Sequence, residues 1–236
     1  MLRAATSYIR LGDGQRETQV MTLAYEPAVA VAAIAQSDKR LAKIIRRAGP
    51  LTLKPDRLQD TFQALLRAII YQQLSGKAAA TIHGRAVAAF GDRKKITPQR
   101  LLGAKDEEIR AVGMSRAKVA AVKDLAAKTL DGTVPSVAKL RRMSDEEIIE
   151  RLTSVRGIGV WTVEMLLMFR LGRPDVLPVS DLGVRKGFML TYGHEEMPKP
   201  SALLDHGERW RPYRSVASWY LWRACDLAAK KTPPAA

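Results

Sequence analysis

Apolar residues recur along most of the chain at the spacing that buries one face of an α-helix. Three clear series lie at residues 62–70, 82–90 and 119–126. Apolar positions three and four residues apart predict amphipathic helices, whereas strict alternation with polar positions would predict strands. Alternating stretches are hard to find here. The pattern therefore predicts an all-α protein.

Turns that contain glycine separate these helical stretches, for example at Asp131-Gly132 and Gly172-Arg173-Pro174. The connections between helices are therefore short, as in a compact helical protein. We expect two lobes. The first combines residues 1–60 with 172–236, and the second is a central lobe of residues 61–171 that ends in a helical hairpin at about 150–171.

The charge balance narrows the class of partner. Lysine and arginine total 39 against 24 acidic residues, which gives a net charge of +15 and a sequence pI of about 10.2. A strongly basic chain suits a polyanion, because phosphate contacts release counterions. An anionic membrane surface would also fit. No apolar run reaches the ~18–20 residues that a membrane span needs, and no secretion signal is found, so we expect a cytoplasmic protein without a membrane partner.

Cysteine and histidine usage bears on cofactors. The single cysteine, Cys225, cannot form an internal disulfide or supply a four-cysteine iron–sulfur cluster. The three histidines show no metal-ligand spacing with acidic residues. We therefore expect no required cofactor.

The sharpest local motif is the stretch LTSVRGIGVWT at 152–162, where Gly157 and Gly159 flank Ile158 between two helices. Glycine permits positive φ and close approach of another backbone. Free N–H groups at the start of the second helix can then hold a phosphate, while Ile158 would anchor the hairpin in the core. An ordinary glycine turn is the alternative.

A longer stretch, VRGIGVWTVEMLLMFRLGRPDVLPVSDLGVRKG, resembles the helix-hairpin-helix, Gly/Pro-rich loop and aspartate (HhH-GPD) signature of a DNA glycosylase superfamily. The blocks IIYQQLSGKAAATI and GMSRAKVAAVKDLA resemble further blocks of that superfamily in the same order, so the resemblance runs from Thr61 to Trp222. It is closest to the alkyladenine (AlkA-like) and 3-methyladenine DNA glycosylases, in a compact form without the full N-terminal β domain. It implies a two-lobed helical fold with the active-site cleft between the lobes.

Asp181 stands at the catalytic aspartate of this signature, within PVSDLG. Taken alone, it is more typical of a helix N-cap, and the two roles are compatible. Cleaving an N-glycosidic bond builds positive charge on the sugar. A fixed carboxylate stabilises that charge and can orient the attacking water. An alkylated purine is already cationic, so it leaves without strong acid assistance.

The resemblance also implies a pocket for a flipped base. Its candidate walls are Trp161, Trp222, Tyr71 and Met165, since aromatic rings attract an electron-poor base. Core packing is the alternative for Trp161, and a half-buried helix position is the alternative for Tyr71. Met165 replaces an aromatic residue, which leaves the lesion range open. Trp161 also stands where lyases of this fold carry a nucleophilic lysine, so no lyase activity is expected.

The remaining DNA contacts are implied in the same way. Leu74, with Gln73, would fill the gap left by the flipped base, although Leu74 could instead be a buried loop leucine. The implied phosphate contacts are Gly157, Gly159, Thr162, Lys77, Arg116 and Lys118. The hairpin of such proteins can hold Na⁺ or K⁺ through backbone carbonyls, which here would be those of Thr153, Val155 and Ile158.

Together these features predict a monomeric, monofunctional glycosylase that excises alkylated purines of the 3-methyladenine and 7-methylguanine type from double-stranded DNA in base excision repair. In a bacterium it would be associated with the nucleoid. Two alternatives stay open at this point. One is a non-catalytic helix-hairpin-helix DNA-binding protein, and the other is a glycosylase for deaminated or oxidised bases.

Overall fold

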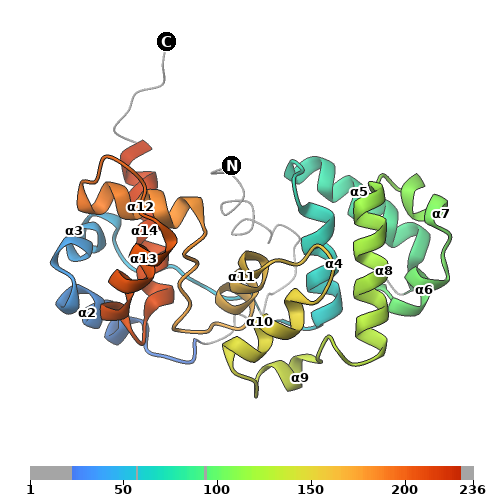
Figure 1. Cartoon of the computed structure of the whole chain (residues 1–236), viewed down its shortest axis with the longest axis horizontal. Helices are drawn as coiled ribbons and strands as arrows, with labels where there is room; N and C mark the ends of the chain where they lie inside the picture. The colour runs from blue at the N-terminus through green and yellow to red at the C-terminus, as the bar shows by residue number, and fades with distance from the viewer. Residues whose placement is uncertain (1–22, 57, 93–94, 230–236) are drawn as a thin grey trace, which may run out of the picture. The chain divides into compact units, whose positions relative to one another are not determined.

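The computed structural model describes residues 23–56, 58–92 and 95–229. This part of the chain is mostly helical (Figure 1), which confirms the predicted all-α class. The β structure within it is a pair of two-residue strands, β1 (Gly91–Asp92) and β2 (Lys95–Ile96), which pair antiparallel. Strands of this length are too short to show an alternating pattern in the sequence.

The chain forms two compact units. One takes the described residues before Leu58 and those from Glu164 onward, and the other takes Leu58–Val163. The first boundary lies close to the expected one. The second falls inside helix α11 (Val160–Arg170) rather than after Leu171. Residues 162–169 of this helix are all buried, so a change in burial along the helix does not mark the boundary.

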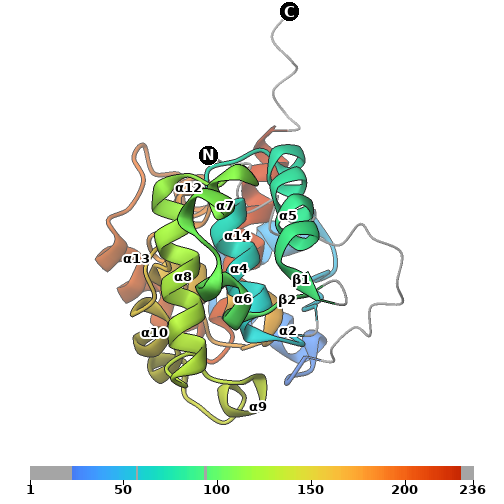
Figure 2. The ribbon, with the colours of Figure 1, turned by 90° about the vertical axis from the view of Figure 1, so that its right-hand side faces the viewer.

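In the unit of Leu58–Val163, helix α8 (Arg116–Leu130) packs against α4 (Thr61–Tyr71) and α6 (Pro98–Gly103), as Figure 2 shows. The other helices that lie wholly within this unit are α5 (Gly76–Phe90), α7 (Asp106–Ala111), α9 (Val137–Leu140) and α10 (Asp145–Thr153). Serine or threonine caps the N-termini of α5, α6, α8, α9 and α10 through side-chain acceptors. These caps satisfy backbone N–H groups that have no partner within the helix.

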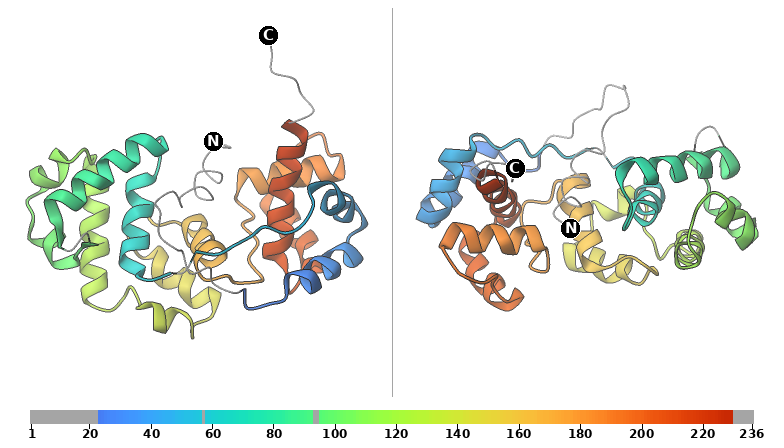
Figure 3. Two further views of the ribbon diagram at one scale, coloured as in Figure 1. Left: turned by 180° about the vertical axis from the view of Figure 1, so that it is seen from behind. Right: turned by 90° about the horizontal axis from the view of Figure 1, so that it is seen from above.

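In the other unit, helix α14 (Arg214–Ala229) forms the centre, and ten consecutive positions from Ser215 to Ala224 include only one that is not buried. It packs against α12 (Leu182–Tyr192), α3 (Lys39–Ala48) and α2 (Pro27–Ser37) (Figure 3). Helix α13 (Pro200–Gly207) and the short 3₁₀ helix η1 (Glu208–Trp210) complete this unit. Burial of a helix on most sides explains why α14 lacks a polar face.

Candidate active site

Asp181 is the N-cap residue of α12, and its carboxylate accepts hydrogen bonds from the backbone and from a side chain. Its Oδ1 accepts hydrogen bonds from the Val184 backbone N–H at 2.7 Å and from Trp222 Nε1 at 2.8 Å. The residue is only 7% exposed. The structure thus confirms the N-cap role. It also shows a carboxylate fixed in orientation by backbone and side-chain hydrogen bonds, which are strong when the acceptor is charged.

Trp222 reaches Asp181 because a glycine leaves room for it. A Cβ atom on Gly183 would come within 2.8 Å of Trp222 Cδ1 and 3.0 Å of Asp181 Oδ1. The indole also stacks on Phe169, with ring centroids 5.7 Å apart. The expectation that Trp222 lines a base pocket needs correction, because its ring is almost wholly buried. In this structure it orients Asp181.

A second acid, Glu164, lies close enough to Asp181 for their charges to interact. Glu164 is 7% exposed, and its Oε2 has no hydrogen-bond partner among the described residues. Burial, followed by the negative charge of Asp181, raises the pKa of Glu164 to about 7. Glu164 is not among the site residues predicted from the sequence. Its signal was an isolated acid within the apolar run Val163–Leu167.

The segment before Asp181 is fastened to the start of α14. Arg214 donates to both carboxylate oxygens of Asp175, from Nε at 2.8 Å and from Nη2 at 2.9 Å. Ser215 Oγ accepts from the Val176 backbone N–H at 2.9 Å and donates to the Arg173 carbonyl at 2.7 Å. These contacts fix the loop that presents Asp181. They join residues that are far apart in the chain, so periodicity could not indicate them.

The hairpin between α10 and α11 presents two exposed glycines around a buried isoleucine. Gly157 and Gly159 are exposed, and Gly157 has φ +81°, whereas Ile158 is 4% exposed. The predicted anchoring role of Ile158 is confirmed. The expected phosphate contact at Thr162 needs correction, because this residue is 5% exposed and its N–H already bonds to the Gly159 carbonyl at 3.0 Å.

Helix α8 holds the hairpin from one side. Asp124 Oδ2 accepts from the Arg156 backbone N–H at 2.7 Å, and Lys128 donates to the Ser154 carbonyl. Within the turn, the Val155 carbonyl accepts from the Ile158 N–H at 3.0 Å. Binding of Na⁺ or K⁺ by the carbonyls of residues 153, 155 and 158 stays a prediction. In the described part of the chain, no group of three or more His, Cys, Asp or Glu residues could hold a metal ion.

The loop between α4 and α5 presents an exposed apolar side chain. Leu74 is 39% exposed, and its neighbour Gln73 is exposed as well, with φ +59°. A non-glycine residue rarely adopts a positive φ. The alternative of a buried loop leucine is therefore wrong, and an exposed apolar tip on a sharply turned loop fits the expected DNA wedge.

This wedge loop is tied to the hairpin. Gln72 Nε2 donates to the Gly157 carbonyl at 2.9 Å, and Lys118 Nζ donates to the carbonyls of Ile70 and Gln72 at 2.7 and 2.8 Å. Burial lowers the pKa of Lys118. Its expected phosphate contact needs correction, because the ammonium supports the loop backbone instead. Lys77 and Arg116 are exposed, and their phosphate contacts stay predictions.

The other candidate pocket residues differ in exposure. Met165 is fully buried and belongs to the core, so its expected place in the pocket wall needs correction. Tyr71 is half-buried, and the Arg67 guanidinium covers its ring at 4.1 Å from the centroid. A cation already on that face would repel a cationic base. Trp161 is half-buried in the first turn of α11, where stacking on a base stays a prediction.

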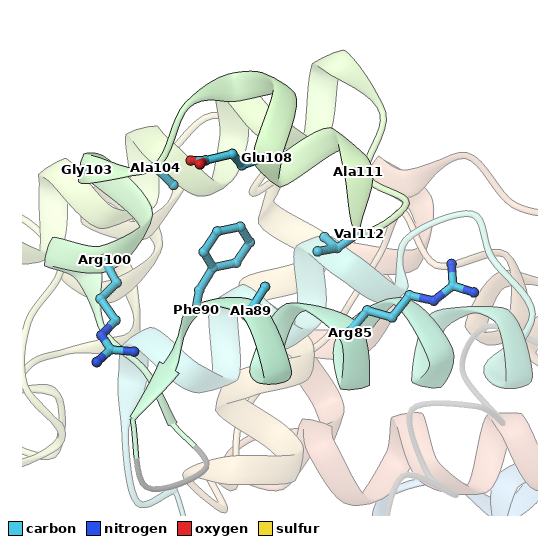
Figure 4. Close-up of a pocket in the computed structure, with 9 residues that line it drawn as sticks. All are labelled: Arg85, Ala89, Phe90, Arg100, Gly103, Ala104, Glu108, Ala111 and Val112. Carbon is cyan, nitrogen blue, oxygen red and sulfur yellow. The ribbon is translucent and has the colours of Figure 1, made fainter.

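A surface pocket of about 710 Å³ lies elsewhere in the unit of Leu58–Val163 (Figure 4). Residues of α5, α6 and α7 line it, with the Phe90 ring in its middle and Arg100 and Glu108 at its edge. It contains none of the site residues predicted from the sequence. Separately, no helix among the described residues is long and apolar enough to cross a membrane.

The chain is similar to known proteins along most of its length. The chain is 34% identical to DNA-3-methyladenine glycosylase 1 of Schizosaccharomyces pombe over 221 residues, which cover 94% of this chain and 96% of the relative. Two solved structures are similar. The 3-methyladenine DNA glycosylase (Mag1) of S. pombe in complex with abasic DNA has a TM-score of 0.72 at 35% identity, covering 85% of this chain and 98% of that one. The DNA-3-methyladenine glycosidase of Bacillus halodurans has a TM-score of 0.77 at 37% identity, covering 86% and 91%. The family described as HhH-GPD superfamily base excision DNA repair protein matches residues 66–212, and the chain belongs to that family.

Proposed function

We propose that this protein is a monofunctional DNA glycosylase that excises alkylated purines from duplex DNA, acting as a monomer and without a required cofactor. The observation that carries the proposal is Asp181, a buried carboxylate oriented by Val184 and Trp222. The relatives named as 3-methyladenine glycosylases support the substrate class. The similar structure in complex with abasic DNA supports duplex binding.

The reaction follows from the charge that develops. The bond between C1′ and the base nitrogen breaks, and its electron pair leaves with the cationic base, which becomes neutral. Asp181 stabilises the positive charge that remains on the sugar. Water then adds to C1′ while Asp181 orients it and accepts its proton. Trp161 offers no amine for a Schiff base, so the product is an intact abasic strand.

The exposed elements of the unit Leu58–Val163 would handle the DNA. Leu74, with Gln73, fills the gap left by the flipped base, while the N–H groups around Gly159 hold a backbone phosphate. The hydrogen bond from Gln72 to Gly157 joins these two contacts. Insertion of the wedge and the grip on the phosphate would therefore be coupled.

Replacement of Asp181 tests the catalytic step. Asn caps a helix about as well as Asp, so Asp181→Asn keeps the fold and removes the charge. We expect single-turnover release of 7-methylguanine to fall about 10²–10³-fold, or ~3–4 kcal/mol. The measurement is the yield of alkali-revealed abasic sites in a singly modified duplex, with thermal unfolding as the control for folding.

Four results would contradict parts of this proposal. Full activity of Asp181→Asn removes its catalytic role. A wild type that binds duplex but releases no base from several lesions is a non-catalytic binding protein. Release of deaminated or oxidised bases alone changes the substrate class. Strand cleavage trapped by borohydride contradicts the monofunctional assignment.

A pair of glycine variants tests the phosphate grip. A Cβ atom on Gly159 would meet nothing within 4 Å, so Gly159→Ala should leave stability unchanged. The added methyl group should obstruct the approach of a phosphate to the backbone N–H groups and weaken duplex binding about tenfold, the cost of one charged hydrogen bond of ~1.5 kcal/mol. Gly157→Ala is the contrasting variant. Its φ of +81° and a Cβ contact of 3.3 Å with Ala121 predict a loss of stability, about 1 kcal/mol. Unchanged affinity of Gly159→Ala would place the phosphate elsewhere.

A further inference from the structure

Glu164 occupies a position that is unfavourable for a charged side chain. The residue is only 7% exposed, and its neighbours Val163 and Met165 are fully buried. Its Oε2 has no hydrogen-bond partner among the described residues. A carboxylate in such surroundings loses its hydration without compensation. Packing alone would be served by an apolar residue of similar volume, so the acid needs another explanation.

The charges around Glu164 make its ionisation depend on Asp181. Burial and the Asp181 charge together raise the pKa of Glu164 to about 7, and no described lysine or arginine offsets them. On α11, Arg170 pairs with Asp56 at 3.2 Å, and on α14, Arg223 pairs with Asp226 at 3.0 Å. On α12 and α14, Cys225 interacts electrostatically with Asp181 and also with Lys186, Arg223 and Asp226.

We propose that Glu164 is a positioning residue that supplies a second negative charge beside Asp181, and that its ionised form speeds cleavage by stabilising the cationic sugar. The inference rests on the proposed function, because the second charge acts on the reaction only through the site of Asp181. Two anions stabilise the positive charge that develops on the sugar more than one does. Conversely, a bound cation favours loss of the Glu164 proton.

The test compares wild type with Glu164→Gln, which mimics the protonated acid at every pH. Single-turnover release of 7-methylguanine would be measured from pH 5.5 to 9 for both proteins. The ratio of the two rates cancels the titration of the base itself. We expect a ratio near one at the acidic end that rises through about pH 7 to about tenfold. With a duplex containing the neutral base hypoxanthine, the ratio should rise over the same pH range, because the cationic sugar forms with either base. Glu195→Gln, at an exposed position of the same unit, is the matched control.

Stability supplies a readout that does not involve activity. A carboxyl with a raised pKa in the folded protein costs stability as the pH rises from its unfolded value of about 4.3 to its folded one. Glu164→Gln should therefore unfold at the same temperature as wild type at acidic pH. Above pH 7 it should unfold at a higher temperature.

The outcomes separate the two proposals. If wild type is active and the ratio of its rate to that of Glu164→Gln does not depend on pH, Glu164 has only a structural role. That result overturns the inference about Glu164 and leaves the proposed function intact. Equal unfolding temperatures across the whole pH range also overturn it. A wild type that releases no base overturns the proposed function, and the inference falls with it.

Discussion

Two aspartates in the same unit begin helices in the same way and differ in what surrounds them. Asp38 is the N-cap of α3 and accepts from the backbone N–H groups of Arg40 and Leu41, at 3.0 and 2.9 Å. Asp181 is the N-cap of α12 and accepts from Val184. They are 5% and 7% exposed. Neither position in a helix nor burial tells the two apart.

The second oxygen of Asp38 gathers donors from distant parts of the chain. Tyr192 donates its hydroxyl to Oδ2, Trp210 Nε1 lies at 3.0 Å, and His206 Nε2 lies at 3.3 Å. Burial by itself would raise the pKa of Asp38, but the hydrogen bonds from His206, Leu41, Tyr192 and Trp210 outweigh it and hold that pKa well below its usual range. This carboxylate ties α3 to α12, α13 and η1.

Asp181, in contrast to Asp38, has a second acidic side chain near it. Its Oδ1 accepts hydrogen bonds from Val184 and Trp222, and its charge interacts with that of a second acid, Glu164. A carboxylate neutralised by donors from several elements holds a structure together. A carboxylate that is oriented by donors and faces a second acid keeps a negative potential, which a cationic transition state can use.

The largest expected effect is the loss of folding stability when Asp38 is replaced. Asp38→Ala leaves several buried donors without an acceptor, so we expect a loss of about 3–5 kcal/mol. The matched control is Asp60→Ala, at a half-buried N-cap whose side chain accepts from the Gln63 N–H. It should lose about 1 kcal/mol. Urea unfolding measures both, and equal losses would mean that the contacts of Asp38 add nothing to its capping role.

The stabilising contribution of Asp38 should be lost at low pH. Because the folded pKa of Asp38 is depressed, its contribution is fully present above the unfolded pKa of about 3.9 and is lost as the pH falls below it. The stability gap between wild type and Asp38→Asn should therefore shrink at the acidic end. A gap that stays constant with pH would contradict the assigned pKa direction.

Local signals predicted much of the fold and part of the site. Helix periodicity, the Gly157-Ile158-Gly159 turn and the cap at Asp181 each depend on residues within a turn or two of one another. The contacts that distinguish Asp38 from Asp181 are not local, since Trp210 lies 172 positions from Asp38. No spacing rule connects residues so far apart.

The type of a residue indicated what kind of interaction its side chain can make, but not which atom it interacts with. Trp222 was expected to stack on a base, and its indole N–H instead orients Asp181. Lys118 was expected to hold a phosphate, and its ammonium instead holds two carbonyls. For Lys118 the interacting group is the ammonium that the sequence suggested, whereas for Trp222 it is the indole N–H and not the face of the ring. The three-dimensional packing decides whether that group meets solvent, ligand or another part of the chain.

A smaller effect is expected when Asp181 loses one of the hydrogen bonds that orient it for base release. Trp222→Phe removes the Nε1 donor at 2.8 Å and retains an aromatic ring next to Phe169. A hydrogen bond to a charged group contributes about 1.5–3 kcal/mol, so single-turnover base release should slow by about 10- to 150-fold. Duplex affinity should stay unchanged. Trp219→Phe, at an equally buried position of α14, controls for the loss of an indole. If both variants release base at the same rate, the indole of Trp222 contributes packing alone, and the orientation of Asp181 depends on its cap.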